Sequence, residues 1–155
     1  MTRTPKSLFR TLAIAEAISW TLLIGGLILR ATRDWPLAVT IGGAIHGFVF
    51  LAYGATAILV AKNQRWSGGP TLVAIASAVI PYATIPVEMW LARSGRLEGA
   101  WRLEQTDDPR DARWHDQLMR WFLNRAWVLA AILALAVIGL YVALLIIGPP
   151  GGREH

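Results

Sequence analysis

The sequence predicts an all-α, polytopic membrane protein with four transmembrane helices in an up-down bundle. A short amphipathic interfacial helix is expected between the third and the fourth. Of the 155 residues, 55% are hydrophobic and only 16% are charged, and the mean hydropathy of +0.45 is high for a water-soluble domain. Four stretches reach the roughly 20 apolar residues that cross a bilayer. Tryptophans at the ends of these stretches, where aromatic belts lie, support the division: Trp35, Trp66, Trp90 and Trp127.

The first two spans are the clearest. Residues 11–29 contain Glu16 as their only ionisable side chain, and residues 36–61 are interrupted only by His46. Both stretches are long enough to cross the hydrocarbon core. Pro36 suits the first turn of a helix, where its missing N–H group costs nothing. We therefore expect two transmembrane helices joined by a short turn.

The third and fourth spans differ in their proline content. Residues 71–91 contain Pro81 and Pro86, so the sequence predicts a kinked helix whose freed carbonyl groups are satisfied by a neighbouring helix. Residues 126–148 carry no charge and predict the fourth span. The tail, residues 149–155, is rich in glycine and proline and is expected to be disordered.

Residues 94–125 form the polar exception between the predicted membrane domain, residues 8–93, and the last span. Several apolar side chains there recur at helical spacing, which indicates a short helix lying along the headgroups or packed on the bundle. The acidic run TDDPRDARWHD is flanked by arginines and is expected to form a solvated, self-paired surface. The apolar side chains of the predicted helix are Trp114, Leu118, Trp121 and Phe122.

Four crossings would place both termini on one side of the membrane and the polar segment on the other. Under that arrangement the basic residues are nearly balanced, with six on the side of the termini and nine on the other, so the positive-inside rule gives no orientation. The six are Arg3, Lys6, Arg10, Lys62, Arg65 and Arg153.

Polar groups inside the spans are costly and ask for an explanation. Antiparallel packing would bring Glu16 and His46 to one level, with Ser19 on the face of Glu16. One hypothesis is a polar pocket, completed by Tyr53 and Tyr82, that binds a small ligand or relays protons. The favoured alternative is a structural tie between two helices, because the chain offers no further acid or base to complete a pathway.

Small residues in the second span predict close helix packing. Gly43 and Gly47 have small-xxx-small spacing, and Gly54 lies two turns further along the same side. With Pro81 of the third span, these glycines are the expected packing positions, and the second span is expected to be the central helix.

Most catalytic chemistries lack their residues here. The chain has no cysteine, no phosphate-binding loop and no paired-histidine metal motif, so we expect no catalytic residues, no metal, no cofactor and no binding of nucleic acid. Glu88 lies near the end of the third span and is expected to reach headgroup water or Arg93.

Three sequence elements indicate a family: RTLAIAEAISW, GxxHGFVFLAY and ASAVIPYATIPVE. Together they resemble the YdzA-like family of bacterial integral membrane proteins, domain-of-unknown-function family 3817, over about residues 8–93. The chain departs from the family pattern at Tyr82 and Ala83, where members have a phenylalanine–glycine pair. The resemblance implies no established activity, but it implies that Glu16 and His46 belong to one feature. The positions that match the family motifs are Glu16, Ser19, His46, Gly47, Phe50 and Pro81.

The leading hypothesis for function is a small accessory or interaction subunit of the bacterial plasma membrane, with Glu16 and His46 as an intramembrane tie. Its expected partners are the lipid bilayer and either another membrane protein or further copies of the chain. The alternative is a proton-linked carrier or ligand-binding membrane protein that uses Glu16 and His46 directly. A membrane-embedded enzyme is the weakest possibility, because no complete catalytic set is visible.

Overall fold

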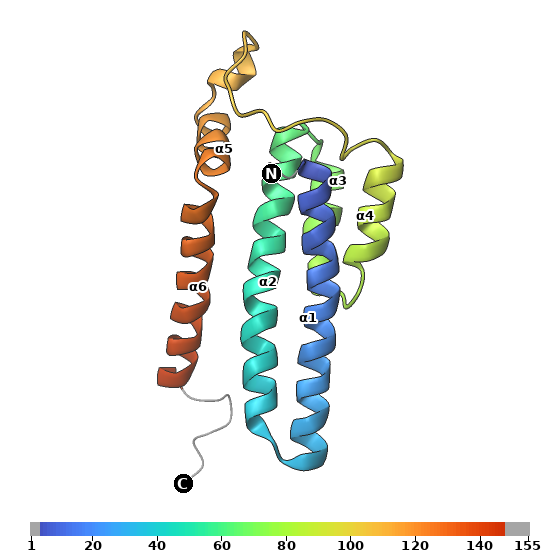
Figure 1. Cartoon of the computed structure of the whole chain (residues 1–155), viewed down its shortest axis with the longest axis vertical. Coiled ribbons are helices and arrows are strands. Elements are labelled where there is room, and N and C mark those ends of the chain that lie inside the picture. Colours follow the sequence, from blue (N-terminus) through green and yellow to red (C-terminus); the bar gives the residue numbers. More distant parts are fainter. Residues whose placement is uncertain (1–3, 148–155) are drawn as a thin grey trace.

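The computed structural model describes residues 4–147, and every regular element in that range is helical (Figure 1). This confirms the predicted all-α class, while the tail predicted to be disordered, residues 149–155, lies outside the described residues. The α-helices are α1 (Pro5–Arg33), α2 (Pro36–Asn63), α3 (Gly68–Ala76), α4 (Thr84–Arg93), α5 (Trp114–Asn124) and α6 (Ala126–Ile147), and two short 3-10 helices are η1 (Ser77–Val79) and η2 (Pro109–Ala112).

Helices α1 and α2 form a long antiparallel hairpin. The backbone N–H of Ser7 donates to the side chain of Thr4 at the start of α1, and Asp34 ends α1 in the left-handed conformation at φ 50°. Pro36 then begins α2, as expected for the first turn. Both helices are long and apolar enough to cross a membrane, which confirms the first two predicted spans.

The close approach of α1 and α2 uses different glycines from those predicted. A Cβ atom on Gly42 would lie 2.7 Å from the carbonyl oxygen of Leu22, and one on Gly26 would lie 2.7 Å from that of Ala38. Only glycine fits at these two positions, because the opposing backbone cannot move aside.

The glycines that the sequence analysis predicted as packing positions, Gly43, Gly47 and Gly54, are not the ones at the α1–α2 backbone contact. A Cβ on Gly47 or Gly54 would meet nothing within 4 Å elsewhere in the described residues, and one on Gly43 would meet only a side-chain methyl of Leu23 at 3.9 Å. The reason is helical phase: Gly43 follows Gly42 by about 100° around α2, so it lies beside the backbone contact with α1 and not within it. Gly43 and Gly47 instead line a groove between α2 and α6.

The third predicted span is not one kinked helix. Residues 71–91 fold into α3, η1 and α4, and the chain reverses direction at Pro81 and Tyr82, with Tyr82 at φ 65°. In Figure 1, α3 and α4 lie side by side, and the hairpin they form reaches only part of the way along α1 and α2. A bond between Trp66 Nε1 and the carbonyl oxygen of Arg96, at 2.8 Å, joins the entry and the exit of the hairpin at one end of the molecule.

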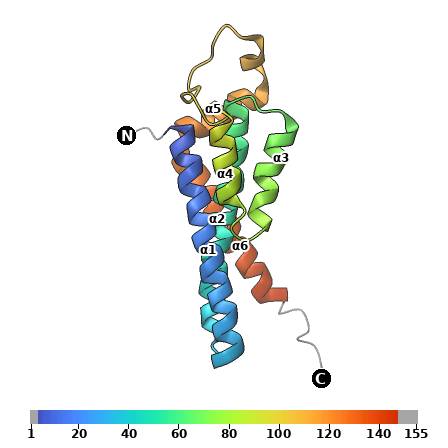
Figure 2. The ribbon, with the colours of Figure 1, turned by 90° about the vertical axis from the view of Figure 1, so that its right-hand side faces the viewer.

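The structure shows fewer candidate crossings than the four that the sequence predicts. Two helices within residues 4–147, α1 and α2, are long and apolar enough to span a membrane, and α5 with α6 makes a third when this pair is counted together. The axes of α5 and α6 are bent by 94° at their junction. Figure 2 shows α6 running along the α1–α2 hairpin toward the end that holds the α1–α2 turn.

Residues 94–113, here called the cap segment, lie at the end of the molecule where α1 begins. The predicted placement of this polar segment, on the side away from the first residues, is wrong because the α3–α4 hairpin returns the chain to its starting end. Asn63 at the end of α2 holds the segment: its side chain donates to the carbonyl oxygen of Ala100 and accepts from the N–H of Arg102. Lys6 of α1 adds an ion pair with Glu98 at 2.5 Å.

Helix α5 confirms the short helix predicted in the polar segment. It buries charged side chains and exposes tryptophans. Its buried residues are Asp116, Met119 and Arg120, which face the cap segment and α2. Trp114 is 73% exposed, and Trp121 is also exposed. Two of its aromatic side chains are thus exposed, as expected of a helix lying at a lipid surface.

The core lies in the half of α1 and α2 that the α3–α4 hairpin covers. Phe9 of α1 and Tyr53 of α2 are fully buried there, with ring centroids 5.4 Å apart. Toward the α1–α2 turn the large apolar side chains are exposed, among them Leu27 and Ile41. Exposed apolar surface on long helices is what a lipid environment requires. The core residues are Phe9, Ala13, Tyr53, Ala57, Val60, Ala74, Ala78, Leu91 and Leu97.

Candidate functional site

Glu16 of α1 and His46 of α2 face each other inside the helix pair, joined by Ser19. Glu16 is fully buried, and its Oε1 lies 3.7 Å from Nδ1 of His46. The hydroxyl of Ser19 lies 2.9 Å from the same His46 nitrogen and 3.1 Å from Oε2 of Glu16. The sequence-based prediction that Glu16 and His46 occupy one level in antiparallel helices thus agrees with the structure.

This arrangement supports one continuous hydrogen-bond chain. A hydroxyl group has one proton to donate, so Ser19 can donate to Glu16 while it accepts from a protonated Nδ1 of His46. Alternatively, Ser19 donates to an unprotonated Nδ1, or to the backbone carbonyl oxygen of Glu16 at 2.9 Å, and leaves the carboxylate without that bond. The group can therefore hold a proton in two places, which is the chemical capacity it offers.

Aromatic rings enclose the imidazole of His46. The ring centroid of Trp20 lies 4.4 Å from that of His46, and the ring of Phe50 lies 6.0 Å away on α2. His46 keeps 13% of its side chain exposed, whereas Glu16 keeps none. The pair is thus packed between side chains of its own helices rather than left open on one side.

Tyr53 and Tyr82, which the sequence analysis assigned to the same pocket, lie elsewhere. The hydroxyl of Tyr53 is 3.0 Å from that of Ser77 in η1. The hydroxyl of Tyr82 is 3.2 Å from that of Thr21, and Tyr82 is 46% exposed. The five side chains therefore divide among three separate contacts, because the hairpin turn carries Tyr82 to the outer surface of α1.

A second buried carboxylate belongs to Glu88 of α4. Glu88 is 4% exposed, and its Oε1 lies 3.7 Å from Nε of Arg10. The expectation of a solvated group reaching Arg93 is therefore wrong, since α4 turns Glu88 toward α1. Oε1 of Glu16 and Oε1 of Glu88 share one property: each is buried without a hydrogen-bond partner in the described chain.

Trp20, which lies deep in the first span, donates a hydrogen bond to the backbone of the α3–α4 hairpin. Its Nε1 donates to the carbonyl oxygen of Ala78 in η1 at 3.2 Å. The hydroxyl of Thr84 donates in the other direction, to the carbonyl oxygen of Ala13 at 2.9 Å. A broken helix leaves carbonyl groups unpaired, and in lipid a neighbouring helix must supply the donor.

The polar cluster of the cap segment was not anticipated in the sequence. Asp111 is fully buried and accepts from Arg102 at 2.6 Å and from Arg65 at 3.0 Å. The side chain and backbone N–H of Thr106 donate to its other oxygen, and these bonds, together with the two arginines, lower the pKa of Asp111 to about 2. The expectation of a solvated acidic surface is therefore wrong for Asp111.

The sequence holds a weak signal for the two glycines at the α1–α2 contact, which the sequence analysis did not identify. Gly26 precedes Asp34 by eight residues and Gly42 follows it by eight, so a tight hairpin brings two glycines to one level. No comparable signal identified Arg102, because its partners lie in α2 and in the following loop. Within the described part of the chain, no group of three or more His, Cys, Asp or Glu side chains could hold a metal ion.

Comparison with known proteins identifies the membrane domain. Residues 6–93 match a family described as a domain of unknown function, DUF3817. A protein of Streptomyces coelicolor named "Putative membrane protein" is 38% identical over 91 residues, which cover 57% of this chain but only 11% of that relative. No solved structure matches the chain significantly. With its apolar helices, its buried Glu16–His46 pair and this match over more than half its length, the chain belongs to the DUF3817 family of uncharacterised membrane proteins.

Proposed function

We propose that this chain is a YdzA-like accessory or interaction subunit of a bacterial plasma membrane, and that it is not an enzyme. In this proposal Glu16, Ser19 and His46 form a structural tie between α1 and α2. One observation carries it: the polar groups of the pair face each other within the protein, at 3.7 Å, and the outer surfaces of the long helices are apolar.

The match to the Streptomyces coelicolor protein supports the same proposal. The matched segment makes up about a tenth of that relative, so the domain stands there within a much longer polypeptide. Covalent attachment of the matched segment to a much longer polypeptide in that relative supports a role of this domain in association with other protein parts.

The accessory role is tested by photo-crosslinking in native membranes. A photoreactive amino acid would replace Leu135 or Ile138 on the exposed face of α6, with Ile18 of α1 as the matched position on another helix face. We expect the α6 positions or the α1 position, but not both, to give one adduct of defined mass. The adduct would contain a membrane protein or a second copy of this chain. Absence of any protein adduct from all three positions would contradict the proposal.

The second candidate function is proton-linked transport or ligand binding by the same groups. Two observations favour it: the unbonded buried oxygens of Glu16 and Glu88, and the α3–α4 hairpin. Interrupted helices at membrane depth commonly border the binding sites of transporters. In this reading the chain from Glu16 through Ser19 to His46 moves a proton rather than holding the helices together.

Reconstituted liposomes with an internal pH-sensitive dye separate the two candidates. Transport predicts that Glu16→Gln and His46→Gln each abolish proton flux, whereas Glu98→Gln leaves it unchanged, because Glu98 is an exposed carboxylate paired with Lys6. A structural tie predicts no flux in the parent protein and lower thermal stability in the first two variants. Equal flux in the parent and in all three variants would eliminate the transport function.

A further inference from the structure

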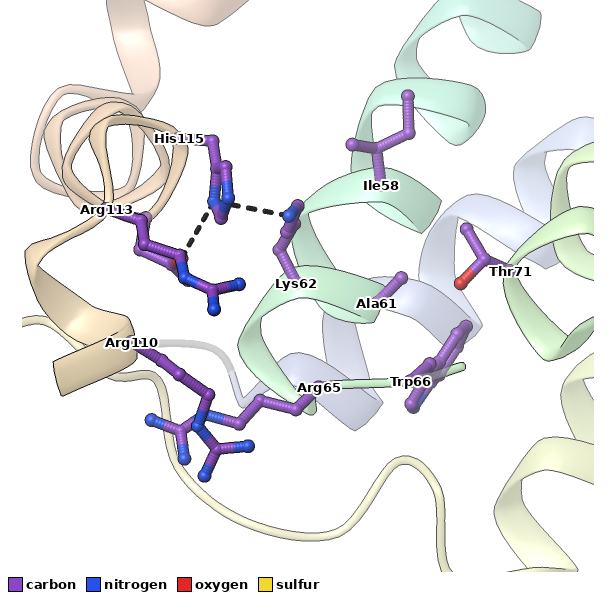
Figure 3. A pocket seen from close by; sticks show the side chains of 10 residues that line it. Ile58, Ala61, Lys62, Arg65, Trp66, Thr71, Arg110, Arg113 and His115 are labelled. Carbon is purple, nitrogen blue, oxygen red and sulfur yellow. Dashed lines mark hydrogen bonds and ion pairs between the residues drawn. The ribbon is translucent and has the colours of Figure 1, made fainter. Parts of the chain in front are cut away.

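A basic pocket lies where the cap segment and α5 meet the end of α2. The pocket has a volume of about 250 Å³ and is lined by ten residues. Figure 3 shows Arg110 and Arg113 approaching from the side of the cap segment and α5, and Lys62 and Arg65 from the end of α2 and the turn after it. The lining residues thus include four cationic side chains and one carboxylate, that of Asp116.

The surrounding carboxylates do not neutralise all of this charge. Asp108 pairs with Arg65 and Arg110, while Asp116 pairs with His115 at 2.8 Å and with Arg102 at 3.5 Å.

Two cationic side chains of the pocket have no carboxylate partner among the described residues. Nζ of Lys62 contacts Nδ1 of His115 at 3.2 Å, and residues 4–147 offer it no carboxylate within 4 Å. The guanidinium of Arg113 makes no hydrogen bond or ion pair with any described residue. In Figure 3 it ends between His115 and Arg110, facing the pocket. A pocket with two uncompensated cations favours an anion.

An apolar groove continues directly from this pocket. The groove has a volume of about 270 Å³ and shares Ile58, Lys62 and His115 with the pocket. Its other walls come from α2, α5 and α6, including Leu118 and Leu129. Farther along the seam of α2 and α6 lies another apolar groove of about 400 Å³, which the predicted packing residues Gly43 and Gly47 line.

The order of these surfaces along α2 is cationic and then apolar. Lys62 lies at the end of α2, whereas the apolar grooves follow α2 from Ile58 back toward Val39. The exposed indole of Trp114 and the bend of 94° between α5 and α6 lie at the boundary. A phospholipid has the same order of charge and apolarity, because its phosphate sits at the interface and its acyl chains extend into the hydrocarbon.

We propose that the basic pocket and the groove along α2 bind one anionic phospholipid. Lys62 and Arg113 contact the headgroup phosphate, and one acyl chain lies against α2, α5 and α6. The site is separate from the Glu16–His46 pair, so the proposal holds whichever function that pair performs.

Native mass spectrometry of the full chain tests the proposal. The protein would be released from nanodiscs that contain equal amounts of phosphatidylglycerol and phosphatidylcholine. We expect the parent to retain phosphatidylglycerol in preference, and the double variant Lys62→Gln, Arg113→Gln to lose about tenfold or more of that preference, since each cation near a lipid headgroup contributes to binding. The matched double variant Arg30→Gln, Arg33→Gln, at the other end of α1, should retain it.

Three results would overturn the proposal. Equal retention of the two lipids by the parent would remove the charge selectivity, and full retention by the Lys62 and Arg113 variant would remove the site. Displacement of phosphatidylglycerol by inorganic phosphate at millimolar concentration would show a free-anion site instead. Arg113→Gln alone serves as the second variant, because its side chain has no partner among the described residues and its loss should leave the thermal stability unchanged.

Discussion

At the scale of single residues, Trp20 joins three parts of the molecule. Its indole donates a hydrogen bond to the carbonyl oxygen of Ala78 in η1, and its ring lies against His46 of α2. Ala78 is 2% exposed, so no water reaches this carbonyl in place of the indole. Trp20 therefore couples the α3–α4 hairpin to the helix pair that holds Glu16 and His46.

Replacing Trp20 with phenylalanine should weaken the hairpin. The aromatic contact with His46 is largely kept, but the donor to Ala78 is lost, which should cost about 1 kcal/mol of unfolding free energy. Unfolding by a denaturing detergent and hydrogen exchange at residues 76–84 measure the effect. Tyr82→Phe removes an exposed hydroxyl from the same hairpin and should stay within about 0.5 kcal/mol. Equal effects of the two changes would count against the role of Trp20.

The glycines of α2 give a second test at the residue scale. Gly42→Ala should destabilise the protein by about 1–3 kcal/mol, because the new Cβ would lie 2.7 Å from the backbone oxygen of Leu22. Gly47→Ala, five residues along α2, meets no atom within 4 Å and should be nearly neutral. The free energy of unfolding of both variants, measured in one detergent, shows which glycine lies at the helix contact. A larger loss at Gly47 would show that α2 packs by the small-xxx-small face instead.

At the scale of elements, the α3–α4 hairpin and the cap segment depend on each other. The hairpin returns the chain to the end where α1 begins, and the cap segment then folds over the end of α2 through Asn63 and Arg102. Arg102 also donates to the carbonyl oxygen of Lys62 and to Asp111. One arginine thus satisfies the last carbonyl groups of α2 and fixes the loop that leads into α5.

The buried Asp111 makes the cap segment sensitive to acid. Because the folded pKa of Asp111 is lowered to about 2 from an ordinary value near 4, its ionised form stabilises the fold above about pH 4. This contribution falls as the pH drops from about 4 toward 2. The protection factors of the amide hydrogens in residues 102–116, which correct for the pH dependence of intrinsic exchange, should therefore fall over that interval.

Asp111→Asn should remove the contribution of Asp111 to this dependence and open the segment at neutral pH as well. Asp107→Asn is the matched control, since Asp107 is an exposed carboxylate in the same loop, and it should leave the pH profile unchanged. An identical profile for the parent and for Asp111→Asn would contradict the assignment.

At the scale of the whole molecule, the α3–α4 hairpin places most basic residues at one end, whereas four crossings would have divided them nearly equally. Eleven of the thirteen Lys and Arg residues in the described range lie at the end where α1 begins, and two lie at the α1–α2 turn. The positive-inside rule therefore predicts that the first end faces the cytoplasm. The eleven are Lys6, Arg10, Lys62, Arg65, Arg93, Arg96, Arg102, Arg110, Arg113, Arg120 and Arg125, and the two are Arg30 and Arg33.

Labelling of single cysteines with a membrane-impermeant maleimide tests this topology, because the chain has no native cysteine. Ser67→Cys and Ser94→Cys, before and after the hairpin, should both be protected in intact cells and react after permeabilisation. Thr32→Cys, near the α1–α2 turn, should react in intact cells. A difference between Ser67 and Ser94 would mean that residues 71–91 cross the bilayer, and reversed labelling of all three positions would overturn the orientation.

The sequence by itself determined the membrane class, the two long helices α1 and α2, and the shared level of Glu16 and His46. These follow from local composition and from helix geometry, because lipid requires about 20 apolar residues per crossing and a short turn fixes antiparallel neighbours.

Only the tertiary structure decided the path of residues 71–91, the end at which the cap segment lies, and the burial of Glu88 and Asp111. Two prolines indicate a break in a helix, but they do not fix the direction in which the chain continues. That direction depends on contacts between distant residues, such as Thr84 with Ala13, Trp66 with Arg96 and Arg102 with Asn63. Such pairings satisfy backbone groups that a broken helix leaves open, and no periodicity in the sequence records them.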